Sequence, residues 1–155
     1  MIIWDSKKLC SEGVVIGSFL VSIKFLFDGC GSLWLSSVYS PNNSLLRKDF
    51  WVEFLDLYGI SFHSWCVGGD FNVIRRILKK LRGSSLTSSM RDFDGFIRDC
   101  ELIDPPLRNA PFTRSNMQDS PVCKRLDRFI FTNEWEQFFP QCFGHQSIQV
   151  GTNSF

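Results

Sequence analysis

The sequence predicts an α/β fold in a single domain. The first third of the chain is rich in β-branched and aromatic residues, an apolar helical period follows at 46–58, and residues 65–67 are apolar and typical of a buried strand. With 155 residues, 44% hydrophobic and 15% aromatic, the chain is large and apolar enough to bury one core. No internal repeat and no linker divides it.

The strands of the first third predict a β-hairpin. Residues 14–16 and 19–27 have the composition of strands, and 33–39 have it again after a Gly-rich turn cluster at 28–32. Such a turn between two apolar runs is typical of antiparallel strands that are neighbours in the sheet.

Two helices and a short third one are expected. In the first, Ser44 is the expected N-cap and Gly59 the expected stop. Its apolar stripe comprises Leu46, Phe50, Trp51, Phe54, Leu55, Leu57 and Tyr58. The second covers 91–100, with a start resembling a capping box at Ser89-x-x-Asp92 and one apolar face. That face consists of Phe93, Phe96, Ile97 and Cys100.

The C-terminal third predicts short elements. Residues 112–113 and 122–131 have the pattern of strands, and 133–139 that of a helix capped by Asn133 and closed by Pro140. Beyond residue 140 no period is evident. The expected organisation is therefore a domain over 1–140 and a divergent tail over 141–155.

Composition excludes several classes of protein. The formal charge of +1 predicts no strong long-range field toward nucleic acid. No apolar run is long enough to span a bilayer, and charged residues interrupt the N-terminus too early for a signal peptide. The six cysteines have no metal-ligand spacing and predict reduced thiols without disulfides in an intracellular protein. They are Cys10, Cys30, Cys66, Cys100, Cys123 and Cys142.

The segment Gly68-Gly69-Asp70-Phe71-Asn72 carries the candidate chemistry. If strand geometry continues to Asn72, alternation places Asp70 and Asn72 on the same face. A carboxylate there can ligate Mg²⁺, and an amide can donate to an anionic oxygen. Gly69 leaves room for a ligand or a neighbouring backbone. The alternative is an ordinary turn, because Gly, Asp and Asn favour turns.

A basic run follows this segment. Arg75, Arg76, Lys79, Lys80 and Arg82 could face phosphates, although a run of charge is also typical of solvated surface.

Four motifs, in order, resemble the endonuclease/exonuclease/phosphatase superfamily, and in wording most of all the endonuclease domain of plant LINE-type (non-LTR) retrotransposons. The resemblance extends over about 13–140. Its motifs are Ser37-Val38-Tyr39-Ser40-Pro41-Asn42, Gly68-Gly69-Asp70-Phe71-Asn72, Phe112-Thr113 and Arg125-Leu126-Asp127-Arg128-Phe129.

This resemblance implies a four-layered sandwich of two β-sheets with helices outside, here incomplete, and Mg²⁺-dependent hydrolysis of a DNA phosphodiester by an in-line water. It implies that Tyr39 touches the scissile phosphate, Asp70 positions or deprotonates the water, Asn72 holds the phosphate, and Asp127 supports the network. Asp70 is the implied metal ligand. Further contacts with phosphate are expected from Arg75, Arg76, Asn42 and Arg125.

Each implied role has a structural alternative. Tyr39 also suits an aromatic position in a strand, and Asp127 also suits a surface partner of Arg125 or Arg128.

The chain departs from the family pattern at both ends. The family's Asn-bearing strand and metal-binding Glu lie upstream of the matched region, and Asp5 and Glu12 are not placed to replace that Glu. The family's Ser-Asp-His motif has no match, because no Asp precedes His145, whose alternative is an ordinary tail residue. Arg114 stands where the family usually has an aromatic residue. The resemblance therefore implies truncation at both ends and impaired catalysis.

Three functions remain open. The first is a fragment of a Mg²⁺-dependent DNA endonuclease, nuclear if the retrotransposon role is retained. The second is a non-catalytic remnant that binds nucleic acid weakly at most, and the third is a phosphatase acting on a small phosphate ester.

Overall fold

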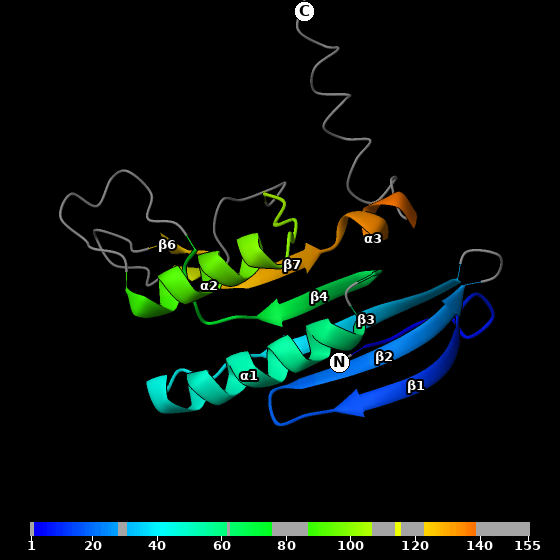
Figure 1. Cartoon of the computed structure of the whole chain (residues 1–155), viewed down its shortest axis with the longest axis horizontal. Coiled ribbons are helices and arrows are strands. Elements are labelled where there is room, and N and C mark those ends of the chain that lie inside the picture. Colours follow the sequence, from blue (N-terminus) through cyan, green and yellow to red (C-terminus); the bar gives the residue numbers. More distant parts are fainter. Residues whose placement is uncertain are drawn as a thin grey trace, which may run out of the picture.

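A computed structural model describes residues 2–27, 31–61, 63–75, 87–106, 114–115 and 123–138. Its centre is a mixed sheet of five strands in the order β1-β2-β3-β4-β7 (Figure 1). These strands are β1 (Cys10–Ile16), β2 (Leu20–Phe27), β3 (Gly31–Tyr39), β4 (Trp65–Asp70) and β7 (Asp127–Phe131). The helices are α1 (Ser44–Ser61), α2 (Ser88–Asp99) and α3 (Asn133–Phe138).

The predicted hairpin is confirmed as β2 and β3, which pair antiparallel from Leu20↔Val38 to Phe27↔Gly31. β1 adds to β2 as a second antiparallel pair. β3 and β4 are parallel, with α1 as the crossover between them, and β7 returns antiparallel beside β4. The fold is therefore of the α/β class.

A second sheet of two strands joins β5 (Arg114–Ser115) to β6 (Cys123–Lys124). The predicted strand over 122–131 is interrupted at Arg125 and Leu126, which lie between β6 and β7. The four-layered sandwich stays a prediction. Residues 112–113, the end of the expected third helix at Pro140 and the tail over 141–155 lie outside the described residues.

The main core lies between the sheet and the pair α1 and α2. Alternate strand residues such as Trp65, Val67 and Ile130 face it because side chains alternate along a strand. The helices contribute the predicted apolar residues Phe50, Phe54, Leu57, Phe93, Phe96 and Ile97, and Cys100 joins them as the C-cap of α2. Leu46 and Leu55 of the expected stripe are exposed instead. Each fully buried aromatic side chain contributes roughly 1.5–3 kcal/mol by leaving water.

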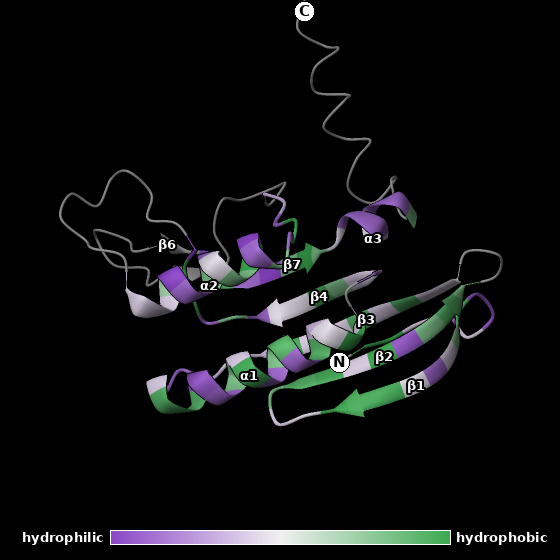
Figure 2. Ribbon diagram, in the orientation of Figure 1, coloured by the Kyte–Doolittle hydropathy of each residue, from purple (hydrophilic) through white to green (hydrophobic). Residues whose placement is uncertain are grey.

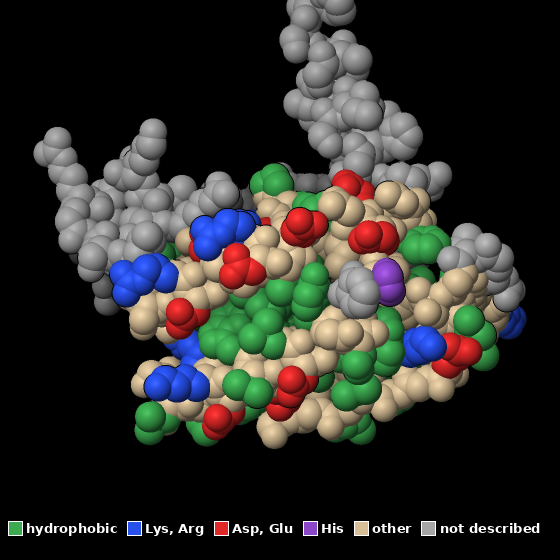
Figure 3. Space-filling model, in the orientation of Figure 1, with side chains coloured by type: hydrophobic (Ala, Val, Ile, Leu, Met, Phe, Trp, Pro, Cys, Tyr) green, Lys and Arg blue, Asp and Glu red, His purple; other side chains and the backbone are tan. Residues whose placement is uncertain are grey.

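Aromatic contacts hold the two helices together. The Trp51 ring of α1 lies 5.8 Å from Phe93 and 5.5 Å from Phe96, both in α2. Hydrophobic side chains also reach the surface between these helices (Figure 3). In Figure 2 the first strands are largely hydrophobic, whereas α3 is mostly hydrophilic.

The opposite face of the sheet has its own apolar cluster. It is built from Ile23, Phe25, Leu33, Cys66, Phe131 and Trp135. The N-terminal segment packs on this face, with the Trp4 ring 5.2 Å from that of Phe25. Trp135 of α3 joins the same cluster, so both faces of the sheet are covered in part.

The expected helix ends are wrong by one to three residues. Asn43, not Ser44, caps α1, since its side chain accepts from the Leu45 amide at 2.9 Å, and the helix passes Gly59 to reach Ser61. Thr87 rather than Ser89 caps α2. Asn133 is the first residue of α3, and the Thr132 hydroxyl accepts from the Trp135 amide instead. A cap depends on which backbone leaves helical geometry, and several polar neighbours can serve.

In the described part of the chain, no helix has the length and apolarity needed to cross a membrane. The cysteines described there as free thiols are Cys10, Cys66 and Cys100. Burial raises the pKa of the Cys100 thiol to about 11, which keeps it protonated at neutral pH.

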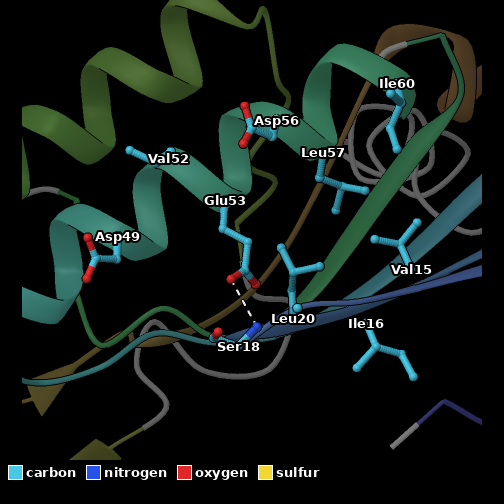
Figure 4. Close-up of a pocket in the computed structure, with 11 residues that line it drawn as sticks. Val15, Ile16, Ser18, Leu20, Asp49, Val52, Glu53, Asp56, Leu57 and Ile60 are labelled. Atoms are coloured by element: carbon cyan, nitrogen blue, oxygen red, sulfur yellow. Dashed lines mark hydrogen bonds between the residues drawn. The ribbon is translucent and has the colours of Figure 1, made fainter.

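Glu53 connects α1 to the turn between β1 and β2. Its carboxylate accepts hydrogen bonds from the Ser18 and Phe19 amides, each at 3.0 Å, and Figure 4 shows the bond from Ser18. We expect Glu53→Ala to lower the free energy of unfolding by about 2 kcal/mol, because two backbone donors lose a charged acceptor. Urea denaturation measures this. Asp49→Ala, an exposed acid of the same helix, should change it much less, and equal losses would contradict the bracing role of Glu53.

Candidate active site at the ends of three strands

Three of the predicted site residues lie in one row across the sheet. Tyr39 pairs with Asp70 in the parallel β3–β4 ladder, and Asp70 pairs with Asp127 in the antiparallel β4–β7 ladder. Partners in adjacent strands point to the same side of a sheet, and in the antiparallel pair of Asp70 and Asp127 the Cβ atoms are expected about 4.5–5.5 Å apart. The fold therefore brings together residues that are far apart in the sequence.

The row lies where β3 and β4 end and β7 begins. Parallel strands end at the same edge of a sheet, which explains why Tyr39 and Asp70 meet. Arg128, next to Asp127, faces the helices, as its guanidinium lies over the Phe93 ring at 5.2 Å. Alternation therefore directs Asp127, and with it the whole row, to the face away from α1 and α2.

Gly69 allows the backbones of β3 and β4 to approach each other closely at this edge. Its φ is +148°, and a Cβ placed there would lie 2.0 Å from the carbonyl oxygen of Val38. The expectation of a close approach at Gly69 is confirmed, and the approaching group is the backbone of β3. The Ser40 amide also donates to the Asp70 carbonyl at 2.8 Å, which ties the two strand ends together.

Asp70 and Asn72 do not share a strand face, contrary to the expectation. β4 ends at Asp70, and Asn72 has a left-handed φ of 49°. The backbone N–H of Asn72 donates to Asp70 Oδ1 at 2.9 Å. The side-chain amide of Asn72 donates through Nδ2 to the Ser40 carbonyl. The chain turns here because Asp and Asn side chains bond readily to nearby backbone, which is the turn that the composition also allowed.

The members of the row differ in their exposure. Tyr39 is 63% exposed, Asp127 is half-buried, and Asp70 is 7% exposed. The Tyr39 hydroxyl is accessible to a ligand from solvent, whereas Asp70 presents little of its carboxylate. Such a row offers one hydroxyl and two carboxylates, which can orient a water or a polar ligand beside Tyr39.

The donors fit a metal ion poorly. Mg²⁺ requires six oxygens in near-ideal octahedral geometry and gives up its own waters reluctantly. Within the described ranges, no group of three or more His, Cys, Asp or Glu side chains could hold a metal ion. The two carboxylates of the row alone do not make a complete site.

Arg75 and Arg125, two of the expected phosphate contacts, bind a carboxylate of the protein itself. Arg75 Nη1 lies 3.2 Å from Asp104 Oδ2, and Arg125 Nη2 lies 2.9 Å from Asp104 Oδ1. Arg75 also pairs with Asp94 at 2.9 Å. Their guanidinium groups are therefore largely engaged within the fold, and their contact with phosphate stays a prediction.

Arg128 is the third arginine on Asp104, at 2.8 Å from Oδ2. Its side chain is 4% exposed and that of Asp104 is 3% exposed. Burial lowers the pKa of Arg128 to about 10 while Asp104 opposes this shift, so the guanidinium stays charged at neutral pH. We call Asp104 with its three arginines the Asp104 hub. The sequence did not predict it, because an aspartate before two prolines is also an ordinary end of a helix.

The remaining expected residues lie apart from the row or outside the described residues. Asn42 is exposed in the segment after β3, where its carbonyl accepts from Arg47 at 3.4 Å. Arg76 and His145 fall outside the described residues. The hydrogen bonds described for Arg125 and Arg128 end on Asp104 and on backbone carbonyls.

No protein-family model and no curated protein matches the chain. The structure is similar to that of the endonuclease domain of TRAS1, a telomere-specific non-LTR retrotransposon, with a TM-score of 0.55 and 12% sequence identity. The similarity covers 75% of this chain and 51% of the TRAS1 chain, so the chain spans about half of that domain. At this identity the likeness concerns the fold, and the chain has an endonuclease-like α/β fold.

Proposed function

We propose that the chain is part of a retrotransposon-type DNA endonuclease in which hydrolysis of the phosphodiester is impaired. The observation that supports this most is the row Tyr39–Asp70–Asp127, which lies at the strand ends of an endonuclease-like fold. The plant LINE type is the finer form of the proposal, and it rests on the wording of the motifs. The same proposal includes a second large sheet packed on the face away from α1 and α2.

The residues of the row would act on a phosphate and a water. Tyr39, the exposed member, would donate its hydroxyl to a phosphate oxygen. Asp70 would accept a hydrogen bond from the attacking water, with Asp127 beside it as the supporting carboxylate. Asn72 stabilises the turn after Asp70 through its backbone N–H and through one N–H of its side-chain amide. The other N–H of that side-chain amide would be the donor to phosphate.

The proposed impairment follows from the donor set. In this class of chemistry a metal ion neutralises charge on the phosphoryl oxygens. Asp70 is the proposed ligand of the metal ion, but its side chain is nearly buried. One of its carboxylate oxygens already accepts a hydrogen bond from the backbone N–H of Asn72. We therefore propose weak Mg²⁺ binding. If general acid–base catalysis is lost as well, the rate of phosphodiester hydrolysis falls by a further ~100- to 10,000-fold.

A nicking assay on supercoiled DNA tests this proposal. Wild type, Asp70→Asn and the exposed-acid control Asp99→Asn are compared in Mg²⁺ and in EDTA. We expect background nicking in every lane. Nicking that requires both Mg²⁺ and Asp70 would overturn the impairment and restore the active endonuclease.

DNA binding and hydrolysis of a small phosphate ester distinguish the other two functions, the non-catalytic remnant that binds nucleic acid weakly and the phosphatase. Fluorescence anisotropy with a labelled duplex should show weak binding that declines as salt rises, as expected for contacts with phosphate. No binding at low salt, combined with hydrolysis of p-nitrophenyl phosphate that Asp70→Asn abolishes, would replace the DNA assignment with a phosphatase.

A further inference from the structure

A groove of about 770 Å³ lies between α1 and the hairpin of β1 and β2, on the helix-covered face of the sheet (Figure 4). Its walls combine apolar and acidic side chains. The apolar ones include Val52 and Ile60 of α1, which are 59% and 58% exposed, and the half-buried Val15 of β1. The acidic ones are Asp49, Glu53 and Asp56. Large apolar side chains left open beside a groove are typical of binding surfaces.

The charge of the groove restricts its ligand. Among the described residues that line it, none is Lys, Arg or His. Asp49 and Asp56 are exposed acids one helical turn to either side of Val52, so they flank the apolar centre. A nucleic acid or an anionic lipid surface would be repelled here, whereas a ligand with both basic and apolar groups is complementary.

The edge of the sheet restricts the shape of the ligand. β1 is the terminal strand in the described five-stranded sheet and pairs with β2 on one side. The pairing shifts between Ser11 and Gly13, and a regular ladder extends from there to Ile16. An outer strand with unpaired backbone groups accepts an extended peptide by β-augmentation.

We propose that this groove binds an extended segment of a partner protein in which basic and apolar residues alternate. The segment would add to the outer edge of β1 over 13–16. Every second side chain would then reach the groove, where apolar groups contact Val52 and Ile60 and basic groups pair with Asp49 and Asp56. Glu53 serves the fold, since both of its described hydrogen bonds go to the turn below it.

The probe is a fluorescein-labelled peptide of alternating lysine and valine, about eight residues long, since a strand rises about 3.3 Å per residue. We expect the double variant Asp49→Asn, Asp56→Asn to bind this peptide about tenfold more weakly, because two ion pairs are lost. The matched control Asp92→Asn, Asp99→Asn removes two exposed acids of α2 and should bind within about twofold of wild type. Equal weakening in both variants would overturn the proposal, since it would show general attraction between charges.

Peptide chemistry tests the strand addition without changing the protein. Two versions of the peptide carry N-methyl groups on alternate residues, one version on each edge. Only one edge faces β1, so one version should lose binding by at least about tenfold while the other keeps it. If both bind like the parent peptide, no strand is added and the proposal fails. Sedimentation gives a last check, because self-association through β1 that the peptide cannot displace would assign the groove to a second copy.

Discussion

Replacing Asp104 with alanine is expected to lower the free energy of unfolding by about 3–5 kcal/mol, because three buried or half-buried guanidinium groups lose their common partner. The Asp104 carboxylate is 3% exposed and lies within 3.2 Å of Arg75, Arg125 and Arg128. Without it, three positive charges would lie together in a poorly solvated place. Chemical denaturation monitored by tryptophan fluorescence measures the loss.

Asp94→Ala is the matched control for this prediction. Asp94 pairs with one of the same arginines, Arg75, but is 44% exposed. An exposed ion pair contributes about 0–1 kcal/mol, so the control should remain near wild type. Similar losses in the two variants would show that the hub is not the stabilising feature.

Gly69→Ala is the second change with a large expected effect, a loss of about 3–5 kcal/mol. The new Cβ would lie 2.0 Å from the Val38 carbonyl oxygen, and the φ of +148° is one that residues with side chains rarely adopt. β3 and β4 would have to separate to remove this clash. Since Tyr39 and Asp70 come directly after Val38 and Gly69, the row would be displaced with them.

Gly59→Ala distinguishes backbone geometry from a general effect of removing glycine. Gly59 lies within α1, and a Cβ there meets nothing within 4 Å. Alanine should therefore stabilise the helix by about 0.5–1 kcal/mol. Thermal unfolding by circular dichroism measures both variants, and a Gly69→Ala protein that melts like wild type would refute the close approach.

Local sequence pattern was sufficient for the elements of the sheet and of the main core. The β2–β3 hairpin follows from two apolar runs around a Gly-rich turn, and the buried faces of α1 and α2 follow from apolar residues at helical spacing. These signals depend on neighbours within a few residues, which is why they can be read without the fold. The observed ends of the helices differ from the expected ones, because neighbouring polar residues compete to cap them.

The row Tyr39–Asp70–Asp127 was expected from the motifs, but its form depends on strand pairing. Parallel pairing of β3 with β4, and the return of β7 beside β4, set which residues lie opposite each other. The sequence suggested that Asn72 would belong to the same face. The structure has a turn there instead, because the Asp70 side chain and the Ser40 carbonyl accept its N–H groups.

The sequence by itself determined the α/β class, the hairpin, most of the core-facing residues of the helices and the candidate residues of the strand ends. Only the tertiary structure decided the partners of the arginines, which reach Asp104 across 21, 24 and 29 residues of chain. The physical reason is that a charged side chain has no periodicity to indicate its partner. It binds whichever opposite charge the fold brings within reach after both have lost water, and that depends on the packing of the whole chain.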